Sequence, residues 1–175
     1  MWDEDIWPFV ETPRLDLLPL PGEAAGALMA GARDRARELI GAELAEDWPL
    51  ADLEDVLPLQ RLATPSAAAY GIWLVVDRQT ATVIADVGFM GPPGDDGDVE
   101  IGYSVSASHR RQGVAGEAVA GLVSWAFGQP DISVIHARCE PDNAGSIRVL
   151  EGNGFTADGV EGGRRRFVRH RPPSA

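Results

Sequence analysis

The sequence lacks lysine altogether, contains one cysteine and has no long apolar run. Arginine therefore carries all 15 positive charges, and the chain cannot be modified on lysine side chains of its own. The single cysteine, Cys139, excludes an internal disulfide and fits a reducing compartment. No apolar run reaches the roughly 18 residues of a membrane span, and the acidic start MWDEDIWPF is unlike a signal peptide. We therefore expect a cytoplasmic protein with no membrane partner.

Acidic residues outnumber basic ones, and the formal net charge is -12. This balance disfavours binding to nucleic acid over a wide surface. The charge is also uneven, because residues 1–100 hold 20 acidic residues and 6 arginines, whereas residues 101–175 hold 7 and 9. We therefore expect an anionic ligand to bind the second part of the chain and a cationic one to be drawn to the first.

A chain of 175 residues, 45% of them hydrophobic, is large enough for one globular domain with its own core. Apolar runs and alternation predict strands over residues 12–20, 70–77, 81–90, 99–106, 132–140 and 164–170. Helical spacing predicts two helices within 22–44 and further ones over 53–62, 114–127 and 143–155. A strand–helix–strand–helix segment after antiparallel strands implies a mixed α/β sheet. We expect the domain to cover residues 12–171, with an N-terminal extension over 1–11 and a tail over 172–175.

The stretch SHRRQGVAGEAV, residues 108–119, joins a predicted strand to a predicted helix. The first N–H groups of a helix have no internal acceptor and lie at the positive end of its dipole. Gly113, Ala115 and Gly116 place little side chain in front of them. Such a helix start is suited to a phosphate or pyrophosphate.

Arg110 and Arg111 add positive charge to the same loop. The alternative is an ordinary glycine-rich turn with two solvated arginines. The loop is not a nucleotide P-loop, because no Gly-Lys-Ser/Thr follows, and it lacks the three glycines of the dinucleotide fingerprint.

RRQGVA, residues 110–115, resembles the pattern Arg/Gln-x-x-Gly-x-Gly/Ala of the GCN5-related N-acetyltransferases (GNAT). EIGYSVSASHRRQGVAGEA is similar to the family's fourth strand, loop and third helix, and EPDNAGSIRVLEGNGF to the segment after its fifth strand. TPRLDLLPL resembles the first strand of the branch that includes ribosomal-protein N-terminal acetyltransferases. The resemblance runs in order through residues 12–170. It implies a single GNAT-like domain of six to seven mostly antiparallel strands, splayed between the fourth and fifth, with about four helices.

The resemblance also implies acetyl-CoA as co-substrate, its pyrophosphate bound by backbone N–H groups of the loop. The residues it assigns to this binding are Val105, Arg110, Arg111, Gln112, Gly113, Val114, Ala115, Gly116, Asn143 and Ser146. We expect no metal, because the three histidines are too scattered in the sequence to form a metal site.

Glu100 is the candidate general base for a direct transfer of the acetyl group to an amine. It lies on the strand that leads into the loop, on the face opposite Val99 and Ile101. A glutamate has an ordinary pKa near 4.3, so it would act through water or with a pKa raised by burial. An exposed strand glutamate is the alternative. The resemblance implies that backbone N–H groups near residues 102–104 stabilise the oxyanion.

The proton donor for the leaving thiolate is less plain from the sequence. Many family members carry a tyrosine four positions before the Gly of the Gly-Phe pair, and here that position is Leu150. In the N-terminal acetyltransferase branch a serine three residues after the asparagine meets the thiolate, and Ser146 follows Asn143 at that spacing. A helix-start serine that bonds the backbone is the alternative. Tyr103 is a further candidate, with core packing as its alternative.

The acceptor implied by the resemblance is a protein N-terminal amine or a small amine, and the protein is expected as a monomer or homodimer. A GNAT-fold module that binds acyl-CoA for sensing or regulation without catalysis is the second hypothesis, and transfer of a longer acyl chain is the third. The aromatic residues Trp2, Trp7 and Phe9 are candidates for core packing, a substrate wall or a dimer contact.

Overall fold

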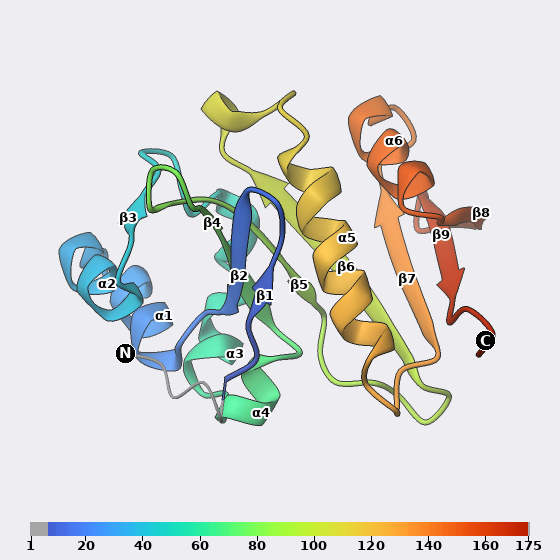
Figure 1. Cartoon of the computed structure of the whole chain (residues 1–175), viewed down its shortest axis with the longest axis horizontal. Helices are drawn as coiled ribbons and strands as arrows, with labels where there is room; N and C mark the ends of the chain where they lie inside the picture. Colours follow the sequence, from blue (N-terminus) through green and yellow to red (C-terminus); the bar gives the residue numbers. More distant parts are fainter. Residues whose placement is uncertain (1–6, 175) are drawn as a thin grey trace.

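The structure is a computed structural model that describes residues 7–174. One sheet of nine strands runs through it in the order β1-β2-β4-β5-β6-β7-β9-β8, and β3 pairs with β5 (Figure 1). The strands are β1 (Val10–Glu11), β2 (Leu15–Pro19), β3 (Glu43–Leu44), β4 (Ile72–Asp77), β5 (Thr82–Phe89), β6 (Asp98–Val105), β7 (Val134–Cys139), β8 (Thr156–Glu161) and β9 (Arg164–His170). The helices are α1 (Gly22–Met29), α2 (Arg33–Ile40), α3 (Leu57–Arg61), α4 (Pro65–Ala68), α5 (Val114–Phe127) and α6 (Ala144–Gly152), with 3-10 turns η1 (Ala51–Leu53) and η2 (Ala107–His109).

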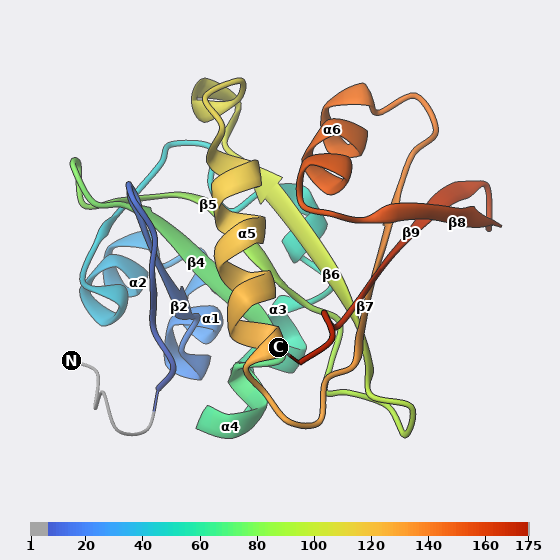
Figure 2. The same ribbon diagram turned by 45° about the vertical axis from the view of Figure 1, so that its right-hand side comes forward.

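The sheet is antiparallel except at β3–β5 and at β6–β7, where α5 forms the crossover. β6 and β7 pair only through residues 98–101 and 134–137 and then separate toward α6 (Figures 1 and 2). These are the fourth and fifth strands predicted from the sequence. The mixed α/β class and the separation between these two strands are therefore confirmed.

The helices divide between the two faces of the sheet. α5 crosses one face and packs on β2, β5 and β6, with α6 beside it over β7 (Figure 1). α1, α2 and α3 pack together on a second apolar cluster that includes Leu20, Leu74 and Trp48. α5 and α6 therefore cover the face of the sheet that carries the first apolar cluster, which includes Leu122, Ile135 and Leu150.

The buried stripe of α5 explains its position against the sheet. Its buried residues are Val114, Ala118, Val119, Leu122, Val123 and Ala126, whereas Ala115, which the helical spacing places in this stripe, is half-buried. Gly121 lies where the helix meets the β1–β2 hairpin, and a Cβ there would lie 2.8 Å from Thr12 Cγ2 and 3.0 Å from Leu17 Cδ1. The absence of a side chain at Gly121 therefore allows the close approach.

The structure contains more elements than the sequence predicts. β8 was not predicted, because all six of its residues are exposed and show no apolar alternation. Residues 43–44 form a strand where a helix was expected, and the helix expected over 53–62 begins at Leu57 after a 3-10 turn. β1, β3 and α4 are two to four residues long, which is too short for a period to be recognised. The estimates of six to seven strands and about four helices were therefore too low.

Several smaller expectations can be compared with the structure. β1 places residues 10–11 of the expected N-terminal extension in the sheet, while Trp2 lies outside the described residues. Trp73 is fully buried and Trp125 packs against it in the core. Cys139 is a buried free thiol. Among the described residues, no helix is long and apolar enough to cross a membrane.

Candidate active site

The predicted phosphate-binding loop leads from the end of β6 into α5. Gly113 is the N-cap residue of α5 and has φ 76°, a left-handed conformation that glycine adopts at little cost. The first intrahelical bond runs from Glu117 N–H to Gly113 O at 3.1 Å. The N–H groups of residues 113–116 consequently have no acceptor within the helix and point out of its positive end.

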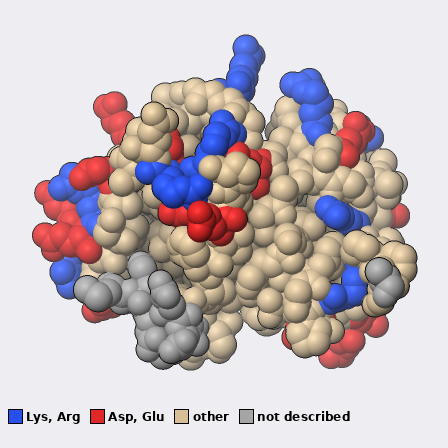
Figure 3. Space-filling view, in the orientation of Figure 1, with Lys and Arg blue, Asp and Glu red and all other residues tan. Residues whose placement is uncertain are grey.

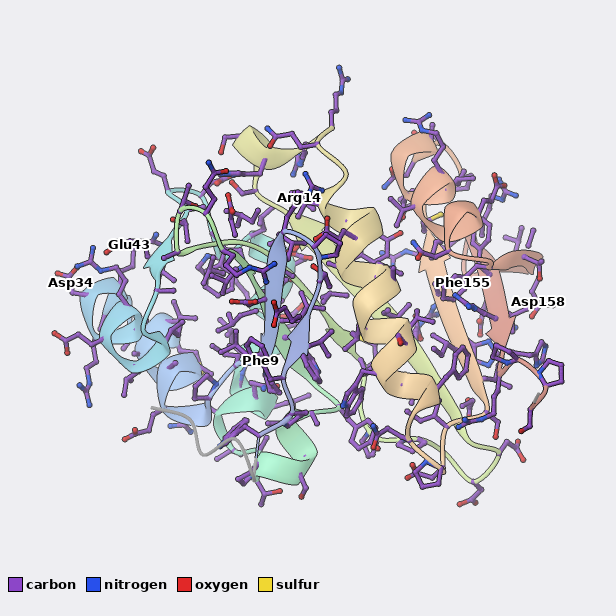
Figure 4. All side chains as sticks on the ribbon, viewed as in Figure 1. Phe9, Arg14, Asp34, Glu43, Phe155 and Asp158 are labelled. Carbon is purple, nitrogen blue, oxygen red and sulfur yellow. The ribbon has the colours of Figure 1, made fainter. Side chains whose placement is uncertain are left out.

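Arg14 and Thr12 brace this helix start from the β1–β2 hairpin. The Glu117 carboxylate accepts hydrogen bonds from Thr12 Oγ1 at 2.5 Å, Arg14 N at 2.9 Å and Arg14 Nε at 2.8 Å, and Arg14 Nη1 donates to Gln112 O at 2.9 Å. Figure 4 places Arg14 at the tip of the β1–β2 hairpin, beside the start of α5. Burial raises the pKa of Glu117, but these hydrogen bonds outweigh it and hold the pKa below its ordinary value. No pattern in the sequence indicates these contacts of Thr12 and Arg14 with the start of α5.

Asp47, from the segment before η1, holds the other end of the loop. Its carboxylate accepts hydrogen bonds from Ser106 Oγ and from Ala107 N at 2.8 Å, and these bonds lower the pKa of Asp47. Arg110 Nε donates to Val105 O at 3.1 Å, while the Arg111 side chain is exposed and its backbone has φ 60°. Hydrogen bonds therefore hold the loop at both ends, to the β1–β2 hairpin through Arg14 and to the segment before η1 through Asp47.

Asp86 lies one strand away from Glu100, on the same face of the sheet. It is 5% exposed, and its Oδ2 accepts hydrogen bonds from Trp48 Nε1 at 3.0 Å and Ser104 Oγ at 2.9 Å. Burial raises the pKa of Asp86 to about 7, although both hydrogen bonds oppose the rise. The sequence analysis did not single out Asp86.

Tyr103 and Ser146 meet across the separation of β6 and β7. Tyr103 Oη lies 2.6 Å from Ser146 Oγ, and burial raises the pKa of Tyr103, so its phenol stays protonated at neutral pH. Asn143 caps α6, since its Oδ1 accepts a hydrogen bond from Ser146 N at 3.0 Å. Leu150 is fully buried in the core and brings no hydroxyl group to this place.

Glu100 projects from the opposite face of β6, as the alternation predicts. Its Oε1 accepts a hydrogen bond from Arg138 Nε at 2.8 Å and its Oε2 accepts one from Arg138 Nη2 at 3.0 Å. The side chains of Glu100 and Arg138 are 26% and 38% exposed, so solvent reaches both. The hydrogen bonds and the negative charge of Glu100 raise the pKa of Arg138 above its ordinary value. Arg138 is a partner of Glu100 that the sequence analysis did not identify.

A pocket of about 380 Å³ adjoins this ion pair. It is lined by Met90, Gly91, Pro92, Gly94, Asp98, Val99, Glu100, His136, Arg138, Glu161 and Arg166. Met90 lies over β6, with its Cε 2.9 Å from the place that a Cβ on Gly102 would take. No group of three or more His, Cys, Asp or Glu side chains in the described part of the chain is arranged to hold a metal ion.

The predicted site residues thus form two groups. The loop residues from Val105 to Gly116 lie at one end of β6, and Asn143 and Ser146 lie across from them at the start of α6. Glu100 is on the other face of β6, beside the pocket. An open helix start, a pair of hydroxyl groups and a carboxylate around one strand fit an enzyme that moves an acyl group from a phosphate-bearing carrier.

Comparisons with known proteins agree with this class. A family model described as an acetyltransferase (GNAT) domain matches residues 14–156. The uncharacterized N-acetyltransferase YjdG of Bacillus subtilis (strain 168) is 33% identical over 149 residues, which cover 83% of this chain and 88% of YjdG. The uncharacterized N-acetyltransferase YoaA of the same strain is 31% identical over 157 residues, which cover 89% of this chain and 86% of YoaA.

Solved structures share the fold. A ribosomal-protein-S5-alanine acetyltransferase from Vibrio fischeri has a TM-score of 0.66 and 18% identity, covering 94% of this chain and 97% of its own. The microcin C7 self-immunity acetyltransferase MccE, solved with acetyl-CoA and AMP, has a TM-score of 0.62 and 15% identity, covering 90% and 93%. The chain belongs to the GNAT acetyltransferase family. It is an acyl-CoA N-acetyltransferase.

Proposed function

We propose that this protein moves the acetyl group of acetyl-CoA directly onto a primary amine, with Glu100 as the general base. The observation that carries the proposal is the open start of α5 at the end of the sheet where β6 and β7 separate. Beyond residue 101 the backbone of β6 has no strand partner on the side of β7. A carrier with a phosphate at one end and a thioester at the other fits this arrangement.

The loop residues would hold the pyrophosphate of acetyl-CoA. The N–H groups of residues 113–116 supply donors, and Arg110 and Arg111 supply positive charge. A Cβ on Gly116 would meet nothing within 4 Å, so the space beside the first turn of α5 is open. Val105, Gln112, Asn143 and Ser146 complete the proposed binding residues.

Glu100 would accept a proton from the acceptor amine, directly or through water. Its position beside a solvent-reached pocket supports this role. The amine nitrogen then attacks the thioester carbonyl carbon, and the C–S bond breaks. Backbone N–H groups of residues 102–104 are proposed to stabilise the oxyanion.

The hydroxyl groups of Ser146 and Tyr103 would protonate the leaving thiolate. Their separation of 2.6 Å allows one proton to be shared between them. The raised pKa of Tyr103 keeps a proton available there at neutral pH. This pair would replace the tyrosine that many family members carry at the position of Leu150.

The acceptor is proposed to be a protein N-terminal amine or a small amine. Structural neighbours include RimL, a ribosomal L7/L12 alpha-N-protein acetyltransferase, at a TM-score of 0.66 and 17% identity. The acidic first part of the chain also favours an acceptor that carries positive charge.

The cofactor site is tested by calorimetric titration with acetyl-CoA. Gly116→Leu fills the space beside the helix start, and we expect binding to weaken at least about tenfold, because an N-terminal donor group becomes blocked. Gly152→Leu is the matched control, since Gly152 is also helical with nothing within 4 Å of a Cβ. Equal affinity of the two variants for acetyl-CoA would show that this loop does not bind the pyrophosphate.

The role of Glu100 is tested by turnover. Glu100→Gln should lower kcat by about 10²- to 10⁴-fold while acetyl-CoA affinity stays unchanged, because only the proton acceptor is lost. Assays would follow release of the free thiol with peptides that carry free N-termini and with small amines. Unchanged turnover with every accepted amine would exclude Glu100 as the base.

A further inference from the structure

Two glycines lie opposite each other on the face of the sheet that carries Glu100. Gly88 on β5 pairs with Gly102 on β6, and alternation places Glu100 and Gly102 on the same face of β6. This leaves a part of the sheet without side chains next to the candidate base. It is also where β6 loses its partner β7, because the pairing of the two strands ends at Ile101.

Different groups lie over the two glycines. A Cβ on Gly88 would lie 2.2 Å from Gly71 O and 3.1 Å from Ile72 Cα, so backbone closes the space above Gly88. A Cβ on Gly102 would lie 2.9 Å from Met90 Cε, which is the far end of a flexible side chain. Of these two covers, the one over Gly102 can make room without a movement of the backbone.

Met90 follows β5 directly and lies opposite Glu100. Its N–H group donates a hydrogen bond to Glu100 O at 3.0 Å, so its backbone is held against β6. The residue is 63% exposed, and it lines the pocket of about 380 Å³ together with Glu100. The chain bends at the next residue, Gly91, which has φ 112°. A fixed backbone thus carries a side chain that is free to change rotamer.

In the proposed function, the two substrates reach β6 from opposite faces. The open start of α5 lies on one face, where charged side chains gather over α2 and near the tip of the β1–β2 hairpin and the surface over α5 is mostly uncharged (Figure 3). Glu100 projects from the other face, beside the pocket. An amine that approaches Glu100 therefore comes from the pocket side and meets Met90 there.

The attacking amine has to come close to Met90. Its nitrogen needs to lie within about 3–3.5 Å of the thioester carbonyl carbon, whose oxygen is proposed to bind the N–H groups of residues 102–104. The carbon atom bonded to this nitrogen lies about 1.5 Å further away, toward the pocket. That carbon and its substituents therefore reach the space over Gly102, which the end of the Met90 side chain fills.

We propose that Met90 is a specificity-determining residue of the acceptor site and favours primary amines with an unbranched carbon next to the nitrogen. This inference rests on the proposed function and names the substrate class of the same site. A CH₂ group beside the nitrogen fits under the Met90 side chain, whereas a branch at this carbon displaces that side chain. Because methionine changes rotamer easily, branched amines are slowed rather than excluded. Among peptides, the same selection favours an N-terminal glycine.

Isomeric amines test this preference with the wild-type enzyme. Butylamine and sec-butylamine have the same atoms and the same charge, but only sec-butylamine is branched beside the nitrogen. Peptides that begin with glycine or with valine form a second pair. We expect kcat/KM to be at least about tenfold higher for the unbranched member of each pair, because one extra carbon in a packed site changes kcat/KM by about 10- to 200-fold. No preference, or the opposite preference, would overturn the inference.

Met90 variants separate the effect of the side chain from the intrinsic reactivity of the amines, which is the same in every variant. Met90→Ala should reduce the preference by about tenfold, through a higher kcat/KM for the branched amine. Met90→Leu keeps the volume in a stiffer side chain, so the preference should persist or increase. Met29→Ala is the matched control and should keep the wild-type preference, since Met29 is 46% exposed at the end of α1 and does not line the pocket. An unchanged preference in Met90→Ala, or an equal change for both amines, would assign Met90 no role in selection.

Failure of this inference is distinct from failure of the proposed function. Transfer to both kinds of amine, with a preference that Met90→Ala does not change, would refute the role of Met90 and leave the proposed function standing. Absence of transfer to every amine and peptide in the wild type and in Met90→Ala, with acetyl-CoA still bound, would refute the proposed function and the inference with it.

Discussion

Asp86 makes the stability of this protein depend on pH in an unusual direction. Its pKa rises from the ordinary 3.8 to about 7, because the folded protein buries the carboxyl group. The folded state therefore binds a proton more tightly than the unfolded state between these two values, and the free energy of unfolding falls as pH rises through them. The stabilisation that protonated Asp86 contributes to the folded state is complete below pH 3.8 and is lost by about pH 7.

The size follows from the difference between the two pKa values. At 1.36 kcal/mol per pKa unit the difference corresponds to about 4 kcal/mol, of which about 3 kcal/mol is lost between about pH 5 and about pH 8. Asp86→Asn removes the titration, while its amide oxygen can still accept hydrogen bonds from Trp48 and Ser104. We therefore expect the variant to resemble the wild type at pH 5 and to be more stable by about 3 kcal/mol at pH 8.

Urea unfolding of both proteins at intervals from pH 5 to pH 8.5 measures this difference. Subtracting one free energy of unfolding from the other at each pH cancels the titration of all other groups, because the two proteins share them. Asp34→Asn is the control, because that side chain is 92% exposed, and its difference from the wild type should stay flat. A flat difference for Asp86→Asn as well, or one that favours the wild type at high pH, would refute the reasoning.

Three other changes have expected outcomes. Gly121→Val should lower the free energy of unfolding by about 1–3 kcal/mol in urea, because its side chain would press on the β1–β2 hairpin; an unchanged midpoint would contradict the close packing. Leu150→Tyr, which restores the family's usual residue, should also cost about 1–3 kcal/mol by overpacking and should not raise kcat; a faster enzyme would show that a proton donor was missing. Tyr103→Phe combined with Ser146→Ala should lower kcat by at least about tenfold at unchanged acetyl-CoA affinity, and equal kcat would place the proton donor elsewhere.

The fold was largely predictable because its long elements have clear periods. β4, β5, β6, α5 and β7 carry apolar residues at strand or helix spacing, and the predicted ranges lie within a few residues of the observed ones. The separation of β6 from β7 came from the resemblance to the family, since no residue pattern encodes it. The short strands and β8 have too few buried residues to give a signal.

The surroundings of the site were harder to predict than its sequence motif. Arg138 meets Glu100 because the parallel β6–β7 register places the two strands side by side, and neither the spacing nor the residue type indicates this. Arg14 and Asp47 reach the loop from distant parts of the chain in the same way. Asp86 differs, because a lone acidic residue within the apolar run ATVIADVGFM was itself a visible signal of a buried carboxyl group.

The separation of β6 from β7 gives this sheet an edge in its interior as well as two at its ends. Exposed strand edges invite pairing with other chains, and proteins usually protect them. The outer edges fit that rule, since β1 has two residues and β8 is irregular and carries Asp158 and Glu161. The inner edge is flanked instead by α5 and α6, so a strand of another protein has little access to it. The unpaired N–H and C=O groups of β6 would promote aggregation if they lay at the outer edge of a sheet. Here they stay unpaired inside the fold, where another chain does not reach them.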